Sequence, residues 1–294
     1  MRMQSMSAER KFLERLSVAD RHWLENLWQQ AQQVPPSQWV QWLLCGDGRS
    51  IHLGWMAPSR ADWLRAYLRP LPSYFSGQLL WPAAKAMQAE RSQWLKEVLS
   101  IAYEQNLISG WRHELYAWWS QPTIPPEPEH PPALLAERAG FRHLGLLSHA
   151  VHVHGFLPDG DLWCGRRSLG KATDPGLLDN LAAGGMSAGE TPIQAVVREL
   201  QEEAGLKVAC SRLTYRGSVR TCRVEQQGWH DERLLVYSFT LKEDEYPKNL
   251  DGEVQDFECL TPTEWVARLR LGLFTADAAA ALVCGLGLTP PSIR

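Results

Sequence analysis

The sequence predicts an α+β protein made of two domains, and three observations support that prediction. The chain has 294 residues, which favours two domains because a domain commonly holds about 150 residues. A proline-rich stretch at 121–135 separates two parts that differ in pattern. In the second part, a long helix pattern lies between two pairs of strand patterns. We therefore expect a smaller α+β domain at 1–145 and an α+β sandwich at 146–294.

Composition and charge exclude several classes of protein. Hydrophobic residues make up 45% and charged residues 21% of the chain, as in ordinary folded domains. The 30 Lys and Arg nearly offset the 33 Asp and Glu, so the net charge of -3 gives no basic field that would favour nucleic acid. No apolar stretch approaches the roughly 20 residues of a membrane span, and the charged N-terminus does not resemble a signal peptide. We expect a small-molecule partner, and neither a nucleic acid nor a membrane.

The cysteines predict a reducing compartment. They are scattered along the chain and form no C-x-x-C pair: Cys45, Cys164, Cys210, Cys222, Cys259 and Cys284. A disulfide-stabilised domain would concentrate them in a much shorter sequence. We therefore expect free thiols and a cytoplasmic location.

The first domain shows helix and strand patterns in alternation. Glycine and aspartate at 46–48 form a turn signal between two apolar runs, which predicts a pair of strands. In order, we expect a helix at 7–33, strands at 38–46 and 50–56, helices at 59–69 and 83–105, and a strand at 111–119. No catalytic cluster is recognisable in this domain.

The second domain contains two pairs of strands around one helix. Alternating residues at 149–157 and 161–168 flank a Pro-Asp-Gly turn, which is a hairpin signal. Two further strands, near 213–224 and 233–241, flank a polar loop that we expect at 225–232. The helix between the pairs begins at Thr191-Pro192 and is closed by Gly205.

Three carboxylates on that helix predict a metal site. Glu199, Glu202 and Glu203 are spaced i, i+3 and i+4, so they share one face of the helix. Like charges at this spacing repel, and the helix dipole disfavours anions near its C-terminal end. A divalent cation would neutralise them, and ligands that are all oxygen favour Mg²⁺ or Mn²⁺. The alternative is an acidic helix face in contact with water only.

The helix belongs to a longer motif, GGMSAGETPIQAVVRELQEEAGL at 184–206. A glycine is followed after five residues by Glu190, and seven further residues lead to Arg198-Glu199 and the remaining carboxylates. This is the full pattern of the Nudix box, and the second domain resembles the Nudix hydrolases. The resemblance implies an α/β/α sandwich with a mixed sheet and metal-assisted hydrolysis of a diphosphate linkage.

The resemblance also implies roles for individual residues. Glu199, Glu202 and Glu203 would bind the metal, together with the backbone carbonyl of Ala183. Arg198 would orient Glu199 through a salt bridge. Gly184 and Gly185 would let the loop approach the site closely, and Glu190 would have a supporting role.

Substrate choice depends on residues outside the motif. Arg166, Arg167 and Lys171 precede it and offer three cations that suit phosphate oxygens, although a basic strand edge in contact with water is the alternative. This stretch, with 251–257 and looser features at 110–116 and 144–156, resembles Nudix proteins similar to the C-terminal part of fungal thiamine pyrophosphokinases. That group implies hydrolysis of thiamine diphosphate, or of its oxo and oxy analogues, to the monophosphate. Trp229, in the polar loop expected at 225–232, is the candidate for covering the flat ring.

Three alternatives to a thiamine-type hydrolase were weighed. Isopentenyl diphosphate isomerases share the RRS and PG pattern, but they place a catalytic cysteine shortly after the position of Asn180, where this chain has Leu181, Ala182 and Ala183. A nucleoside-diphosphate hydrolase acting on ADP-ribose or a dinucleotide fits the motif equally well. A non-catalytic module that senses a diphosphate would have no evident use for intact metal carboxylates.

Two further positions carry chemistry. Glu253 follows the motif by about fifty residues and is a candidate metal ligand or general base, with an exposed turn acid as the alternative. His152 and His154 alternate with valines on a strand. Because no third soft ligand is near them in the sequence, we expect polar strand positions rather than metal ligands.

Overall fold

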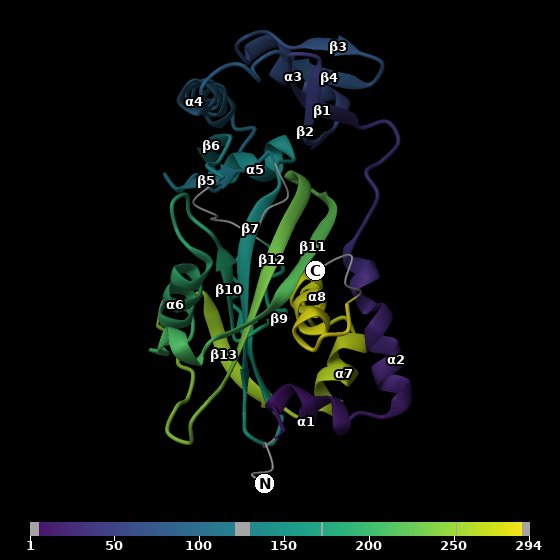
Figure 1. Ribbon diagram of the computed structural model, residues 1–294, viewed down its shortest axis with the longest axis vertical. Coiled ribbons are helices and arrows are strands. Elements are labelled where there is room, and N and C mark those ends of the chain that lie inside the picture. Colours follow the sequence, from purple (N-terminus) through teal and green to yellow (C-terminus); the bar gives the residue numbers. More distant parts are fainter. Residues whose placement is uncertain (1–5, 121–129, 172, 251, 290–294) are drawn as a thin grey trace.

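The computed structural model describes residues 6–120, 130–171, 173–250 and 252–289, and it has the predicted α+β architecture (Figure 1). The first nine residues of the proline-rich stretch at 121–135 lie outside the described residues. Within those residues, no helix is both long and apolar enough to cross a membrane.

The C-terminal half is built on a mixed seven-stranded sheet. Its five main strands lie in the order β11-β12-β7-β8-β13, while β10 pairs with β7 and β9 with β8. Strands β7 and β12 run parallel, and the other pairs are antiparallel. The strands are β7 Ser148–Phe156, β8 Leu162–Arg167, β9 Leu178–Asp179, β10 Ala182–Gly185, β11 Thr214–Glu225, β12 Gly228–Thr240 and β13 Val254–Leu260. The predicted hairpin of 149–157 and 161–168 is confirmed as β7 and β8.

Helices cover both faces of this sheet. Helix α6 (Pro192–Glu202) lies on one face, and α7 (Pro262–Arg270) and α8 (Ala276–Gly285) lie on the other, as Figure 1 shows. Neighbouring residues of β12 point to opposite faces: Leu235 packs in the core beside α6, while Leu234 packs in the core beside α8. The α/β/α sandwich is therefore confirmed. A short 3-10 turn, η2 (Cys210–Arg212), precedes β11.

The first helices of the chain pack on this C-terminal half. The expected helix at 7–33 is divided into α1 (Ala8–Glu14), α2 (Val18–Leu27) and the 3-10 turn η1 (Trp28–Ala31). It is interrupted because the Ser17 side chain accepts a hydrogen bond that starts α2. Phe12 of α1 is buried in the same core as Phe156 and Trp265. These helices therefore lie with the sandwich, although the sequence assigned them to the first domain.

The rest of the N-terminal half has a sheet and a core of its own. Its strands, β1 (Val40–Gly46), β2 (Arg49–Met56), β3 (Ser73–Phe75) and β4 (Gln78–Trp81), lie in the order β2-β1-β4-β3. Strands β1 and β2 were predicted, whereas β3 and β4 were not. Helices α3 (Pro58–Tyr67) and α4 (Gln88–Glu104) correspond to those expected at 59–69 and 83–105. This core is rich in tryptophan, with Trp42 and Trp81 fully buried against each other.

A third group of elements joins the two halves. Strand β5 (Leu115–Trp118) pairs with β6 (Leu134–Glu137), and α5 (Arg138–Leu144) follows directly. The proline-rich stretch therefore connects two strands that pair with each other. In Figure 1 this group lies between the N-terminal sheet and the end of the large sheet.

Candidate active site

Helix α6 begins at a strong capping box. Thr191 accepts a hydrogen bond from the Gln194 amide, the Gln194 side chain accepts one from the Thr191 amide, and Pro192 takes the first helical position. Ala195 and Leu200 are fully buried in the core beneath the helix. This packing fixes which face of the helix remains for the carboxylates.

The three carboxylates of α6 lie at a cavity of about 730 Å³. Glu199 and Glu203 are only 6% and 7% exposed, whereas the Glu202 side chain is half exposed. The Ala183 amide donates to Glu203 Oε2 over 2.9 Å, which ties the strand before the motif to the helix. A Cβ on Gly184 would lie 1.9 Å from Glu199 Oε1, so only glycine leaves room for that carboxylate.

Arg198 holds the motif together. Its Nη1 donates to Glu199 Oε1 at 2.6 Å and to Glu202 Oε2 at 3.2 Å. Its other nitrogens bind both oxygens of Glu190 at 2.8 and 2.9 Å, and Nη2 also reaches the Gly185 carbonyl at 3.0 Å. The expected pair of Arg198 and Glu199 is present, and Glu190 supports it by anchoring the guanidinium.

The charges on α6 are poorly compensated. The pKa of Glu203 is raised to about 8. Burial is the largest cause and the negative charge of Glu199 adds to it, while the positive charge of Lys171 has a smaller, opposite effect. Burial also raises the pKa of Glu199, despite Arg198. Buried carboxylates in this state favour either protonation or a bound cation. An all-oxygen donor set fits a hard divalent cation such as Mg²⁺ or Mn²⁺.

Lys171 and Glu253 face these carboxylates across the cavity. The Lys171 Nζ contacts the Glu253 carboxylate and lies 3.7 Å from Glu203 Oε1. Burial would raise the pKa of Glu253, but the hydrogen bond and charge of Lys171, with the charges of Arg112 and Arg138, hold it below its ordinary value. Glu253 is therefore a carboxylate of the site.

Two of the three predicted cations reach the cavity. Lys171 and Arg167 line it, although Arg167 is already bound to Asp179 Oδ2 at 3.0 Å and to the Thr173 carbonyl. Arg166 is not among the lining residues, because neighbouring strand residues point to opposite faces. Its guanidinium pairs with Asp256 and Glu258. The prediction that Arg166, Arg167 and Lys171 together bind phosphate is therefore wrong for Arg166.

Trp229 does not lie at the cavity. The polar loop expected at 225–232 is wrong, because β11 and β12 are joined by a tight turn and residues 228–232 already belong to β12. Trp229 is 2% exposed, and its ring packs edge-on against Trp39. The aromatic side chains that line the cavity are those of Tyr116 and Phe141.

The two strand histidines are buried. His152 lines the cavity, and its Nδ1 lies 2.7 Å from Asn180 Oδ1. His154 lies two residues further along the same face of β7, against Gly285 of α8, and burial, with the charges of His152 and Arg216, lowers its pKa to about 3. Both are strand positions, as predicted.

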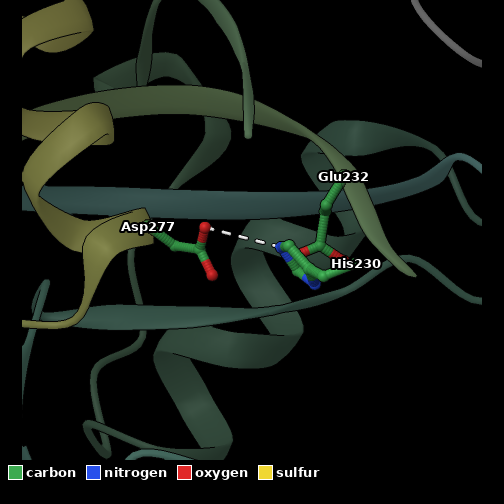
Figure 2. A group of neighbouring side chains, drawn as sticks. All are labelled: His230, Glu232 and Asp277. Carbon is green, nitrogen blue, oxygen red and sulfur yellow. Dashed lines mark ion pairs between the residues drawn. The ribbon is translucent and has the colours of Figure 1, made fainter. Parts of the chain in front are cut away.

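A second polar cluster, which the sequence did not indicate, also lines the cavity. His230 and Glu232 share one face of β12, and Asp277 opens α8 (Figure 2). Ligand atoms of the three lie within 4.8 Å of one another. The spacing of His230 and Glu232 could have indicated that they share one face of a strand. The sequence gives no comparable signal for Asp277, because it is distant in the chain.

Arginine side chains already contact the possible metal-ligand atoms of this second cluster. Arg142 Nη2 lies 3.0 Å from His230 Nδ1, and His230 Nε2 lies 3.5 Å from Asp277 Oδ1. Arg223 binds both oxygens of Asp277 at 2.8 and 3.0 Å. Burial would raise the pKa of Asp277, but His230 and Arg223 hold it well below its ordinary value. Because two guanidinium groups already face this cluster, the carboxylates Glu199, Glu202 and Glu203 are better suited to hold a cation.

A glycine-rich strand followed by a helix with buried carboxylates, on a mixed α/β/α sheet, is an arrangement that could hold a metal ion beside a substrate. The family model described as NUDIX domain matches residues 148–281. Residues 148–281 are therefore a Nudix domain.

Relatives extend the similarity beyond this domain. Nudix hydrolase 20, chloroplastic, of Arabidopsis thaliana is 34% identical over 200 residues, which are 66% of this chain and 52% of that protein. Nudix hydrolase 24, chloroplastic, of the same plant is 33% identical over 198 residues, which are 66% and 53%. The chain spans about half the length of these curated relatives. The crystal structure of DR0079 from Deinococcus radiodurans aligns with a TM-score of 0.37 at 26% identity, over 46% of this chain and 80% of that one.

Proposed function

We propose that the protein hydrolyses the diphosphate linkage of a small organic diphosphate with the help of a divalent cation. The observation that carries the proposal is the cluster of Glu199, Glu202 and Glu203 at a cavity that also contains Lys171. Such a reaction requires acidic groups that hold a metal ion, and it requires a cationic side chain that binds phosphate oxygens.

The roles of the residues follow from their positions. Glu199, Glu202, Glu203 and the Ala183 carbonyl would hold the cation, which when bound neutralises phosphate charge and activates water. Arg198 keeps Glu199 in place. Lys171 binds phosphate oxygens once the substrate enters. Glu253, ionised at neutral pH, accepts the proton of the attacking water on its carboxylate.

Thiamine diphosphate and its oxo and oxy analogues are the first candidate substrates. Glu232 faces the cavity and accepts a hydrogen bond from Ser148 Oγ at 2.8 Å. The rings of Tyr116 and Phe141 line the same cavity and suit a cationic ring. Thiamine diphosphate combines such a ring with a diphosphate.

A nucleoside-diphosphate derivative of the ADP-ribose type is the second candidate. The cavity continues past α6 to Thr173, Gln227 and His230, whose side chains offer hydrogen bonds to a base or a sugar. The two candidates therefore differ in the organic group that would occupy the cavity beside the diphosphate.

A substrate panel distinguishes them. The purified chain with Mg²⁺ is given thiamine diphosphate, its oxy analogue, ADP-ribose, NADH, CoA and dNTPs, and the products are identified by phosphorus NMR, with EDTA as the control. We expect the highest kcat/KM for a thiamine-type diphosphate, which yields the monophosphate and phosphate. A higher value for ADP-ribose than for every thiamine analogue selects the second candidate. A folded, metal-loaded chain that cleaves no diphosphate overturns the hydrolase proposal.

A further inference from the structure

The N-terminal half lines the candidate active site. The segment 109–116 and helix α5 supply one wall of the cavity, including Arg112, Tyr116 and Arg138. We call this segment and α5 the roof. A Nudix domain that began at residue 148 would have no counterpart to this wall.

Direct contacts fix the roof to the Nudix motif. Glu114 Oε1 accepts a hydrogen bond from Ser187 Oγ at 2.6 Å, and the Leu115 carbonyl accepts one from the Ala188 amide at 2.7 Å. A Cβ on Gly185 would lie 1.6 Å from the Tyr116 hydroxyl, so the roof fits against a glycine of the motif. The roof is therefore fixed to β10 and to the loop that leads from β10 to α6.

The two arginines of the roof differ in their surroundings. Arg138 is bound to Glu114 Oε2 at 2.9 Å and lies over the Tyr116 ring, 5.6 Å from its centre. The Arg112 side chain is exposed, lines the cavity, and forms no ion pair with any carboxylate in the described part of the chain. Its positive charge nonetheless helps to lower the pKa of Glu253 on the opposite wall. Arg112 is thus a cation that faces the carboxylates without a bound anion.

We propose that the N-terminal half completes the substrate site and that Arg112 of the roof binds the diphosphate group of the substrate. This rests on the proposed function, because it assigns a phosphate ligand to the same cavity. The diphosphate would lie between Arg112 on the roof and Lys171 on the Nudix domain. A guanidinium suits this position because it can bind two phosphate oxygens at once.

Binding of a bare diphosphate tests the proposal without catalysis. Imidodiphosphate, which has no P-O-P bond, is titrated calorimetrically into the full chain with Mg²⁺. We expect Arg112→Gln to weaken binding about tenfold or more, as for loss of a charge-assisted hydrogen bond, and Arg112→Lys to weaken it less. Arg65→Gln is the matched control, because Arg65 is an exposed arginine of α3 outside the cavity. Thermal melts verify that each variant is folded.

The outcomes separate this proposal from the proposed function. The proposal is supported if wild type and Arg65→Gln bind imidodiphosphate equally well and Arg112→Gln binds it clearly more weakly. Equal binding by Arg112→Gln and wild type overturns the role of Arg112 while leaving the hydrolase proposal intact. A metal-loaded wild type that binds no imidodiphosphate overturns both.

Discussion

The hydroxyl of Tyr116 occupies the space that a side chain at Gly185 would need. A Cβ on this glycine would lie 1.6 Å from Tyr116 Oη and 2.5 Å from the ring carbon that bears it. Tyr116 belongs to the N-terminal half, and Gly185 belongs to the Nudix motif. The two halves are therefore matched in shape where the cavity opens between them.

A double-mutant cycle tests this match. Gly185→Ala should destabilise the protein because the new methyl group meets the Tyr116 ring, and Tyr116→Ala should remove that clash. We expect the double variant to lose less free energy of unfolding than the sum of the single variants, by about 1 kcal/mol or more. Denaturant unfolding of the four proteins gives the coupling. Strictly additive losses would contradict the proposed packing.

Lys171 should compete with metal for the same carboxylates. Its ammonium contacts Glu253 and lies 3.7 Å from Glu203 Oε1, so it occupies part of the space that a cation would take. Without substrate, Lys171→Met should tighten Mn²⁺ binding on the order of tenfold, or about 1.4 kcal/mol. The same variant should bind diphosphates more weakly.

Titration with Mn²⁺, followed by electron paramagnetic resonance, measures this change. Lys85→Met is the matched control, because Lys85 is an exposed lysine that pairs with Asp47 and does not line the cavity. Unchanged or weaker Mn²⁺ affinity in Lys171→Met would show that the ammonium does not compete.

Trp229 should matter for stability and not for the choice of substrate. Because it is buried against Trp39, Trp229→Ala should cost about 3 to 5 kcal/mol of unfolding free energy, and Trp229→Phe less. In the folded Phe variant, kcat/KM should change by the same factor for substrates with and without a cationic ring. A loss confined to ring-bearing substrates would mean that the indole reaches the ligand.

Acid should destabilise the protein through its buried histidines. The pKa of His154 is about 3 in the folded chain, mainly because of burial, against about 6.5 in an unfolded chain. Between these values the unfolded state binds more protons, so stability is complete above pH 6.5 and falls as the pH drops through this window. Each histidine with such a pKa lowers the free energy of unfolding by about 2 kcal/mol at pH 5.

His154→Leu isolates this effect. The loss of unfolding free energy between pH 7 and pH 5 should be smaller than in wild type by about 2 kcal/mol. Denaturant unfolding at the two pH values measures it, and His22→Leu, at an exposed position of α2, should behave as wild type. An undiminished acid loss in His154→Leu would contradict a neutral, buried His154.

Helix α6 and its carboxylates could be predicted because the information that specifies them is local. Capping by Thr191, the carboxylate spacing and the closing Gly205 all lie within one short segment, and the structure keeps them together. The alternation of apolar residues likewise predicted β7 and β8. These features depend on neighbours in the chain, which the sequence displays directly.

The rest of the site depends on contacts between distant segments. Polar residues at 228–232 resemble a loop, but they form a strand because partners from distant segments and the neighbouring strand contact them, as Arg220 does for Asp231 and Arg142 for His230. The roof could not be foreseen either. Nothing near Arg112 in the sequence indicates that it faces Glu253, which is 141 positions away.

The turnover number of Glu203→Gln tests the central claim most directly. If Glu203 holds a divalent cation that acts in the transition state, this variant should remain folded, and its kcat with saturating Mg²⁺ should fall at least roughly a hundredfold. Glu104→Gln, at an exposed glutamate of α4, is the matched control and should retain full activity. A folded, metal-saturated Glu203→Gln with the kcat of wild type would contradict metal-dependent hydrolysis at this helix.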